Sequence, residues 1–231
     1  MRRHPLRLAP WFLVLLPLVG VSVVFGGTSF FAEGPPASRT GAIAIGAKPA
    51  EGICTQCHHT VDANGDPVDN FNTPGGGVQI LDVPTTYVPG TTYPLRVHLA
   101  SDSTAQFPDR RWGFELTAVR ASDGEGAGSF VLPPGDTLKV KTGFTDFSSR
   151  SYIEHTFVGT RVGLASPVEW AFEWQAPATD VGRIYFFCAG NAASGNLGDD
   201  GDFIYTTVDS TGGESVPVAR MSWGALKARF R

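Results

Sequence analysis

The feature that most constrains the fold is a series of short segments between Val78 and residue 208 in which apolar and polar residues alternate. Alternation with a period of two is typical of strands that bury one face. Turn-forming residues separate the segments, and no helical period lies between them. We expect strands at 78–83, 92–99, 112–119, 128–132, 137–141, 152–158, 168–174, 182–188 and 203–208. Nine short strands predict an all-β, immunoglobulin-like β-sandwich.

Three of these segments supply the expected core. Their inward faces carry apolar and aromatic residues, whereas the alternate positions, such as Gly113, Glu115 and Thr117, are expected to face outward. The inward residues are Leu95, Val97, Leu99, Trp112, Phe114, Leu116, Trp170, Phe172 and Trp174. We interpret these aromatic side chains as core rather than as a binding platform.

Composition agrees with a loop-rich β domain and argues against one class of partner. The 231 residues include 28 Gly and 17 Pro, and 17% are charged, which is unlike a helical bundle. The formal net charge is −4 and the 18 basic residues are scattered. No nucleic-acid partner is therefore expected, and basic partners are favoured.

The N-terminus predicts export. Arg2, Arg3 and Arg7 precede an apolar run, so residues 1–32 are interpreted as a signal peptide or an uncleaved N-terminal membrane anchor. Either interpretation places the rest of the chain on the periplasmic or cell-surface side. We divide that remainder into a linker (33–51), a haem-attachment segment (52–77), the β-sandwich domain (78–209) and a C-terminal tail (210–231).

The stretch CTQCHH carries the strongest chemical signal. Cys54, Cys57 and His58 form a C-x-x-C-H unit, which is typical of c-type haem attachment. Two thiols bond one edge of the porphyrin, and the histidine becomes an axial ligand of the iron. The prediction is one covalent haem c on an irregular arm. A disulfide, a thioredoxin-like motif or a zinc site using His59 is the alternative, but no second C-x-x-C completes a zinc tetrahedron.

The sixth iron ligand is expected to be His155. Alternation in SYIEHTFVG places Ile153, His155 and Phe157 on an apolar face, opposite Tyr152, Glu154 and Thr156, where an imidazole needs a hydrogen bond or a metal.

The other candidates are less suitable. His59 is one peptide, about 3.8 Å, from His58 and cannot reach the opposite face of the same iron. His98 falls on the polar side of its strand with Arg96, Met221 has no recognisable ligand loop around it, and His4 lies in the targeting segment.

Two acidic stretches resemble calcium loops without matching one. Asp62, Asn64 and Asp66 imitate the start of such a loop, but Pro67 replaces the required glycine. The cluster of Asp199, Asp200 and Asp202 is interpreted as a solvated acidic turn, with calcium binding as the alternative.

As a set, the segments CTQCHH, YVPGTTYPLRVHL, WGFELTAV, YIEHT, WAFEWQAP and AGNAASGNLGDDGDFIYTT resemble the choice-of-anchor V domain family, which is related to Reeler-type domains. The resemblance covers about residues 45–209 and implies an exported, Reeler-like β-sandwich. Many members carry a Cys-x-x-Cys-His unit and a His-Thr, and the matching residues here are Cys54, Cys57, His58 and His155. Cys188 departs from the family, and we expect it to be a buried free thiol.

Together these signals predict an exported monohaem c-type cytochrome with bis-histidine iron. It would transfer electrons to or from redox partner proteins, for example within a membrane electron-transfer complex, and no catalytic residue is assigned. Two alternatives stay open. One is a haem enzyme or gas sensor with an open distal site, and the other is a Reeler-like adhesion or ligand-binding module.

Overall fold

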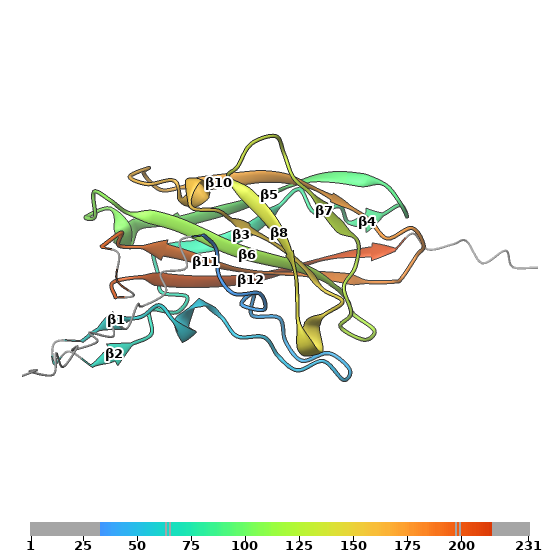
Figure 1. Ribbon diagram of the computed structural model, residues 1–231, viewed down its shortest axis with the longest axis horizontal. Helices are drawn as coiled ribbons and strands as arrows, with labels where there is room; N and C mark the ends of the chain where they lie inside the picture. The colour runs from blue at the N-terminus through green and yellow to red at the C-terminus, as the bar shows by residue number, and fades with distance from the viewer. Residues whose placement is uncertain (1–32, 63, 65, 197, 199, 214–231) are drawn as a thin grey trace, which may run out of the picture.

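The computed structural model describes residues 33–62, 64, 66–196, 198 and 200–213. These residues form two stacked β-sheets, which confirms the predicted all-β sandwich (Figure 1). The proposed signal or anchor at 1–32 and residues 214–231 of the predicted tail lie outside the described residues. No helix among the described residues is long and apolar enough to cross a membrane.

The two sheets differ in size. The four-stranded sheet has the order β3 (Gly76–Leu81), β5 (Thr92–Ser101), β10 (Val168–Gln175) and β7 (Ser129–Val131). The six-stranded sheet has the order β4 (Thr86–Tyr87), β12 (Phe203–Gly213), β11 (Ile184–Ala193), β6 (Arg111–Arg120), β9 (Ser151–His155) and β8 (Leu138–Thr142). Strand pairing is antiparallel except between β12 and β4.

Short elements complete the described part of the chain. A small hairpin pairs β1 (Thr60–Val61) with β2 (Pro67–Val68). Four single-turn 3₁₀ helices are η1 (Cys54–Gln56), η2 (Asp102–Thr104), η3 (Thr145–Phe147) and η4 (Val158–Thr160). Each of the nine predicted strands is present, and β11 and β12 run several residues beyond their predicted ends.

The main core lies between the two sheets. The aromatic and aliphatic stripes predicted on β5, β6 and β10 are at most 3% exposed, and Trp174 packs edge-on against Phe186 of β11 with ring centroids 4.9 Å apart. Cys188 is a free thiol that is fully buried in this core, as expected, and burial raises its pKa well above the ordinary value.

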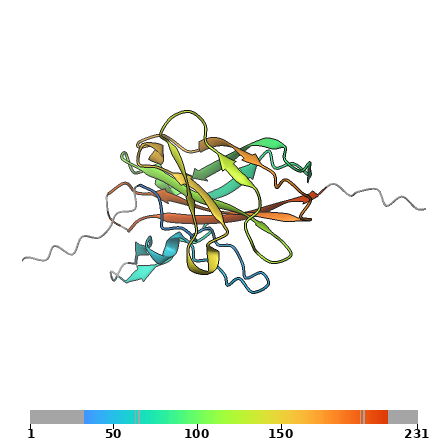
Figure 2. The same ribbon diagram turned by 45° about the vertical axis from the view of Figure 1, so that its right-hand side comes forward.

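The outer face of the six-stranded sheet is also buried, contrary to the prediction. Alternation assigned Glu115 and Thr117 of β6 and Tyr152 and Glu154 of β9 to the polar face, yet all four are completely inaccessible to solvent. Residues 33–53, here called the strap, cover this face (Figures 1 and 2). The predicted linker is therefore irregular in backbone but packed on the sheet.

The strap is a long hairpin held by backbone and buried polar contacts. Gly41 N–H donates to Gly52 O at 2.9 Å, and Glu51 N–H donates to Ala42 O at 2.8 Å. The Glu51 carboxylate accepts a hydrogen bond from the Tyr152 hydroxyl at 2.6 Å and is ion-paired with the buried Arg150. Because a buried carboxylate is costly unless it is paired, these contacts define where the strap sits.

Candidate functional site

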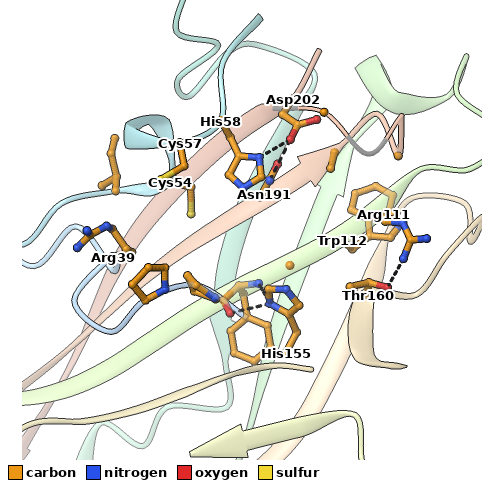
Figure 3. Close-up of a pocket in the computed structure, with 18 residues that line it drawn as sticks. Arg39, Cys54, Cys57, His58, Arg111, Trp112, His155, Thr160, Asn191 and Asp202 are labelled. Carbon is orange, nitrogen blue, oxygen red and sulfur yellow. Dashed lines mark hydrogen bonds and ion pairs between the residues drawn. The ribbon is translucent and has the colours of Figure 1, made fainter. Parts of the chain in front are cut away.

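A cavity opens on the outer side of the six-stranded sheet, where the strap leads into the C-x-x-C-H turn (Figure 3). The four predicted site residues, Cys54, Cys57, His58 and His155, all border it. The space between its walls is about 890 Å³ when the part open to solvent is included. In Figure 3, His58 enters from the side of the turn and His155 from the opposite side.

The C-x-x-C-H turn is built by local hydrogen bonds. The backbone N–H groups of Cys57 and His58 both donate to Cys54 O, at 3.1 and 2.9 Å, which closes the single turn η1. Cys54 is 9% exposed and packs with Ala189 and Ile204 of the sheet, whereas Cys57 is exposed. Burial raises the pKa of Cys54 to about 12. The turn thus anchors one thiol on the sheet and presents the other at the surface.

His58 is oriented by a buried carboxylate that the sequence did not indicate. Its Nδ1 lies 2.6 Å from Oδ2 of Asp202, a residue that is 1% exposed. Asp202 also accepts hydrogen bonds from Asn191 Nδ2 at 3.2 Å and from Ser194 N–H at 2.8 Å. Asp202 was expected in a solvated acidic turn, and this expectation was wrong. With Nδ1 occupied, Nε2 is the ring nitrogen left to bind a metal.

His155 sits where β9 leaves β6. The ladder between the two strands ends at the pair Glu115–Glu154, and His155 Nδ1 then lies 3.0 Å from N and 3.2 Å from O of Phe114. The imidazole lies against Gly113, where an added Cβ would be 2.6 Å from His155 Cε1. Among the described residues Nε2 has no hydrogen-bond partner. Burial lowers the pKa of His155 to about 4, so the ring is neutral at pH 7.

The prediction that Phe157 lies on a buried apolar face with Ile153 and His155 is wrong. The chain turns into η4 directly after β9, so Phe157 is 46% exposed rather than part of the core. Instead, the Arg111 guanidinium stacks over the Phe157 ring, with the guanidinium carbon 5.1 Å from the ring centroid. This contact, with a hydrogen bond of 3.3 Å from Arg111 Nη1 to Thr160 Oγ1, holds Arg111 at the cavity.

Three buried polar atoms at the cavity have no partner in the part of the chain that the structure describes. They are Arg39 Nε, Arg111 Nε and Asn191 Oδ1.

Haem carries an apolar ring, vinyl groups and two carboxylates. Two thiols, two imidazoles with available Nε2 atoms and two guanidinium groups therefore fit its chemistry. No group of three or more His, Cys, Asp or Glu among the described residues is arranged to hold a metal ion, but a porphyrin supplies four ligands itself.

The remaining sequence candidates lie elsewhere. His98 faces outward on β5 and its Nδ1 is 2.9 Å from Glu169 Oε1. Asp62 Oδ1 accepts hydrogen bonds from Asn64 N–H at 2.8 Å and Asp66 N–H at 3.0 Å, as in a self-capped turn. Met221, His4 and Asp199 lie outside the described residues.

Comparisons with known proteins give low similarity. No protein-family model matches the chain, and no curated protein matches it. Among solved structures, the Reelin-N domain of F-spondin is 16% identical, covers 64% of this chain and 91% of its own, and has a TM-score of 0.38. A fragment of the human F-spondin reeler domain is 17% identical over 66% of this chain and 95% of its own, with a TM-score of 0.37.

A cohesin module from a Clostridium perfringens family 33 glycoside hydrolase is 9% identical over 61% of this chain and 98% of its own, with a TM-score of 0.39. Reeler domains are therefore among the similar structures, as the sequence resemblance led us to expect. At these TM-scores the likeness carries no information about function.

Proposed function

We propose that the protein is an exported monohaem c-type cytochrome that transfers single electrons through bis-histidine iron. One observation carries the proposal. The C-x-x-C-H turn and His155, which are far apart in the sequence, border the same cavity from opposite sides. Nδ1 of His58 lies against Asp202, and Nδ1 of His155 lies 3.0 Å from N and 3.2 Å from O of Phe114. A histidine whose Nδ1–H donates to such an acceptor has Nε2 free for a metal, as metal-ligating histidines usually do.

Each side chain has a defined task in this proposal. Cys54 and Cys57 would hold the porphyrin edge, and His58 and His155 would bind the iron through Nε2. For His155 this requires the tautomer in which Nδ1–H donates to Phe114 O. Arg39 and Arg111 would pair with the haem carboxylates. When bound, the haem supplies a one-electron redox centre, and two histidine ligands set a lower reduction potential than a His/Met pair would.

The partners follow from this assignment. A six-coordinate iron has no open position for a substrate, so the reaction partner would be another redox protein on the periplasmic or cell-surface side. If residues 1–32 are retained as an anchor, the protein would be a subunit of a membrane electron-transfer complex. An enzyme or gas sensor would instead require that His155 leave the iron open.

A second candidate is a binding module without covalent haem. The observation that favours it is that the cavity combines apolar walls with polar groups of Thr160, Arg111 and Asn191. In that case a free apolar ligand with an acidic group would take the place proposed here for haem.

The deciding experiment is expression of the full chain with haem-attachment machinery, followed by a pyridine haemochrome assay and visible spectra with and without carbon monoxide. The cytochrome proposal expects one covalent haem per chain and sharp low-spin bands that carbon monoxide does not move. A double variant, Cys54→Ser with Cys57→Ser, should lack covalent haem and serves as the control. A spectrum that shifts readily with carbon monoxide would favour the enzyme or sensor, and absence of covalent haem would favour the binding module.

A further inference from the structure

We propose that Asp202 is a positioning residue that fixes the proton of His58 on Nδ1 and makes His58 a stronger electron donor to the iron. This inference rests on the proposed function. The first observation is geometric. Asp202 Oδ2 is 2.6 Å from His58 Nδ1, which is the short distance expected of a charge-assisted hydrogen bond.

The surroundings of Asp202 leave His58 as the main partner of its carboxylate. The carboxylate is 1% exposed, and its other partners are the neutral donors Asn191 Nδ2 and Ser194 N–H. Among the ion pairs of the described residues, the one that involves Asp202 is with His58 and not with a lysine or arginine. A buried carboxylate without a cationic partner interacts strongly with the nearest polar hydrogen, which here is the imidazole N–H.

This arrangement has two chemical consequences. An acceptor on Nδ1 holds the tautomer in which the Nε2 lone pair is available, and it increases the electron density that Nε2 can donate to a metal. A stronger donor ligand would stabilise oxidised iron over reduced iron and so lower the reduction potential. His155 differs, because its Nδ1 faces neutral backbone groups of Phe114, with N at 3.0 Å and O at 3.2 Å, and no carboxylate. The two histidines would therefore be unequal as ligands, and His58 would be the stronger donor.

Asn191 moderates the effect. Its Nδ2 donates to Oδ2 of Asp202, the same oxygen that accepts from His58, so it draws electron density away from the imidazole hydrogen bond. Removing this donor leaves more of the carboxylate charge for His58. The variants Asp202→Asn and Asn191→Ala should thus shift the reduction potential in opposite directions, which general loosening of the site would not produce.

The test is a redox titration of the haem-loaded full chain. Asp202→Asn should favour reduction by about tenfold in the one-electron equilibrium constant, which is a rise of about 59 mV. Asn191→Ala should lower the potential by a smaller amount. Asp200→Asn is the matched control, because Asp200 bonds Asn196 and not His58, and it should leave the potential unchanged. Unchanged potentials in both Asp202→Asn and Asn191→Ala, or shifts of the same sign, would overturn the inference.

A haem-independent measurement separates this inference from the proposed function. Nitrogen-15 NMR of the full chain made without haem-attachment machinery reports which ring nitrogen of His58 carries the proton. The inference expects Nδ1–H in the unaltered protein and a shift toward Nε2–H in Asp202→Asn, since an amide can donate to Nδ1. A mixture of tautomers that Asp202→Asn does not change would reject the role of Asp202 even if haem binds. The expected shift would support the placement of the His58 proton by Asp202 even if haem does not bind.

Discussion

At the scale of single residues, the position of His155 depends on the place where two strands separate. Nδ1 of His155 meets the backbone of Phe114 just beyond the last β6–β9 pair, so the imidazole lies beside the sheet edge rather than in the inter-sheet core. Both Phe114 backbone groups are within hydrogen-bond distance of that nitrogen. The ring is therefore held at one end and free at the other, which suits a ligand that must be in place before the metal group arrives.

The first prediction concerns the sixth ligand. His155→Ala should keep covalent haem, because Cys54 and Cys57 are untouched, but should replace the low-spin spectrum by a high-spin one that responds to carbon monoxide. His98→Ala is the control, since His98 faces outward and pairs with Glu169. An unaltered low-spin spectrum after His155→Ala would remove the residue from the iron.

The second prediction concerns Glu115, which is fully buried. Its Oε2 accepts the Arg39 N–H at 2.6 Å, while Oε1 has no hydrogen-bond partner among the described residues. Burial raises the pKa of Glu115 well above its ordinary value. An acid with a raised folded-state pKa contributes stability that is fully present below the unfolded pKa, about 4.3, and is lost as the pH rises toward the folded pKa.

Glu115→Gln keeps an acceptor for Arg39 N–H and removes this titration. The free energy of unfolding of the variant should therefore rise relative to that of the unaltered protein by about 1.4 kcal/mol per pH unit above about pH 4.3, until the folded pKa is passed. Urea unfolding at pH 4, 6 and 8 measures the difference. A difference between the two proteins that stays constant across this range would show that burial does not raise the pKa of Glu115 above its value in the unfolded chain.

At the scale of elements, strand β6 connects the core to the cavity. Trp112 and Phe114 face the other sheet, whereas Gly113 faces the strap side and leaves room for the His155 ring. A side chain at position 113 would occupy the space that the imidazole uses. The glycine is therefore a steric requirement of the proposed ligand position rather than of the strand, because strands generally lose stability at glycine.

The third prediction tests this requirement. In Gly113→Ala the new Cβ would lie 2.6 Å from His155 Cε1, so the ring must move and we expect loss of most of the low-spin spectrum with covalent haem retained. Gly77→Ala on β3 is the matched control, because an added Cβ there meets nothing within 4 Å. Equal low-spin spectra in both variants would mean that the His155 ring is not confined by Gly113.

Much of this element-level description could be predicted from the sequence. Strict alternation on β5, β6 and β10 identified the core stripes, because a strand that buries one face must alternate. The same rule failed on the second face of β6 and β9, where it equated polar residues such as Glu115 and Tyr152 with solvent exposure. Their burial depends on the strap, an irregular segment without a period that could have indicated where it packs.

The candidate site, too, could be predicted from the sequence only in part. Cys54, Cys57 and His58 could be proposed because haem attachment fixes their spacing. His155 was proposed because alternation places it among apolar residues, whereas His4, His59, His98 and Met221 are less suitable. Asp202 and Asn191 were missed because they belong to β11 and the loop that follows it, and contact His58 only through the fold. In the sequence Asp202 is one of several acidic residues in a glycine-rich turn, and only its burial distinguishes it.

At the scale of the whole molecule, acidic residues are concentrated beside the C-x-x-C-H turn. The sequence contains no Lys or Arg between Lys48 and Arg96, whereas Asp62, Asp66 and Asp69 in this range are all exposed. Cys57, which would hold the porphyrin edge, is exposed at the start of the same region. A redox partner of the kind proposed above would meet these exposed carboxylates at this edge, and charge complementarity would then favour a basic partner.

The fourth prediction follows from this charge distribution and needs no identified partner. The reduced protein should be oxidised by a small cationic metal complex with a rate that falls about tenfold between low and physiological ionic strength, since screening weakens the attraction. An anionic complex should show the opposite trend. The double variant Asp66→Asn with Asp69→Asn should reduce the salt dependence of the rate for the cationic complex. Asp82→Asn, which lies outside the predicted haem-attachment segment (52–77), should change that salt dependence less. If the anionic complex reacts faster at low salt, electrons leave the protein elsewhere, and the edge beside Arg39 and Arg111 becomes the expected exit.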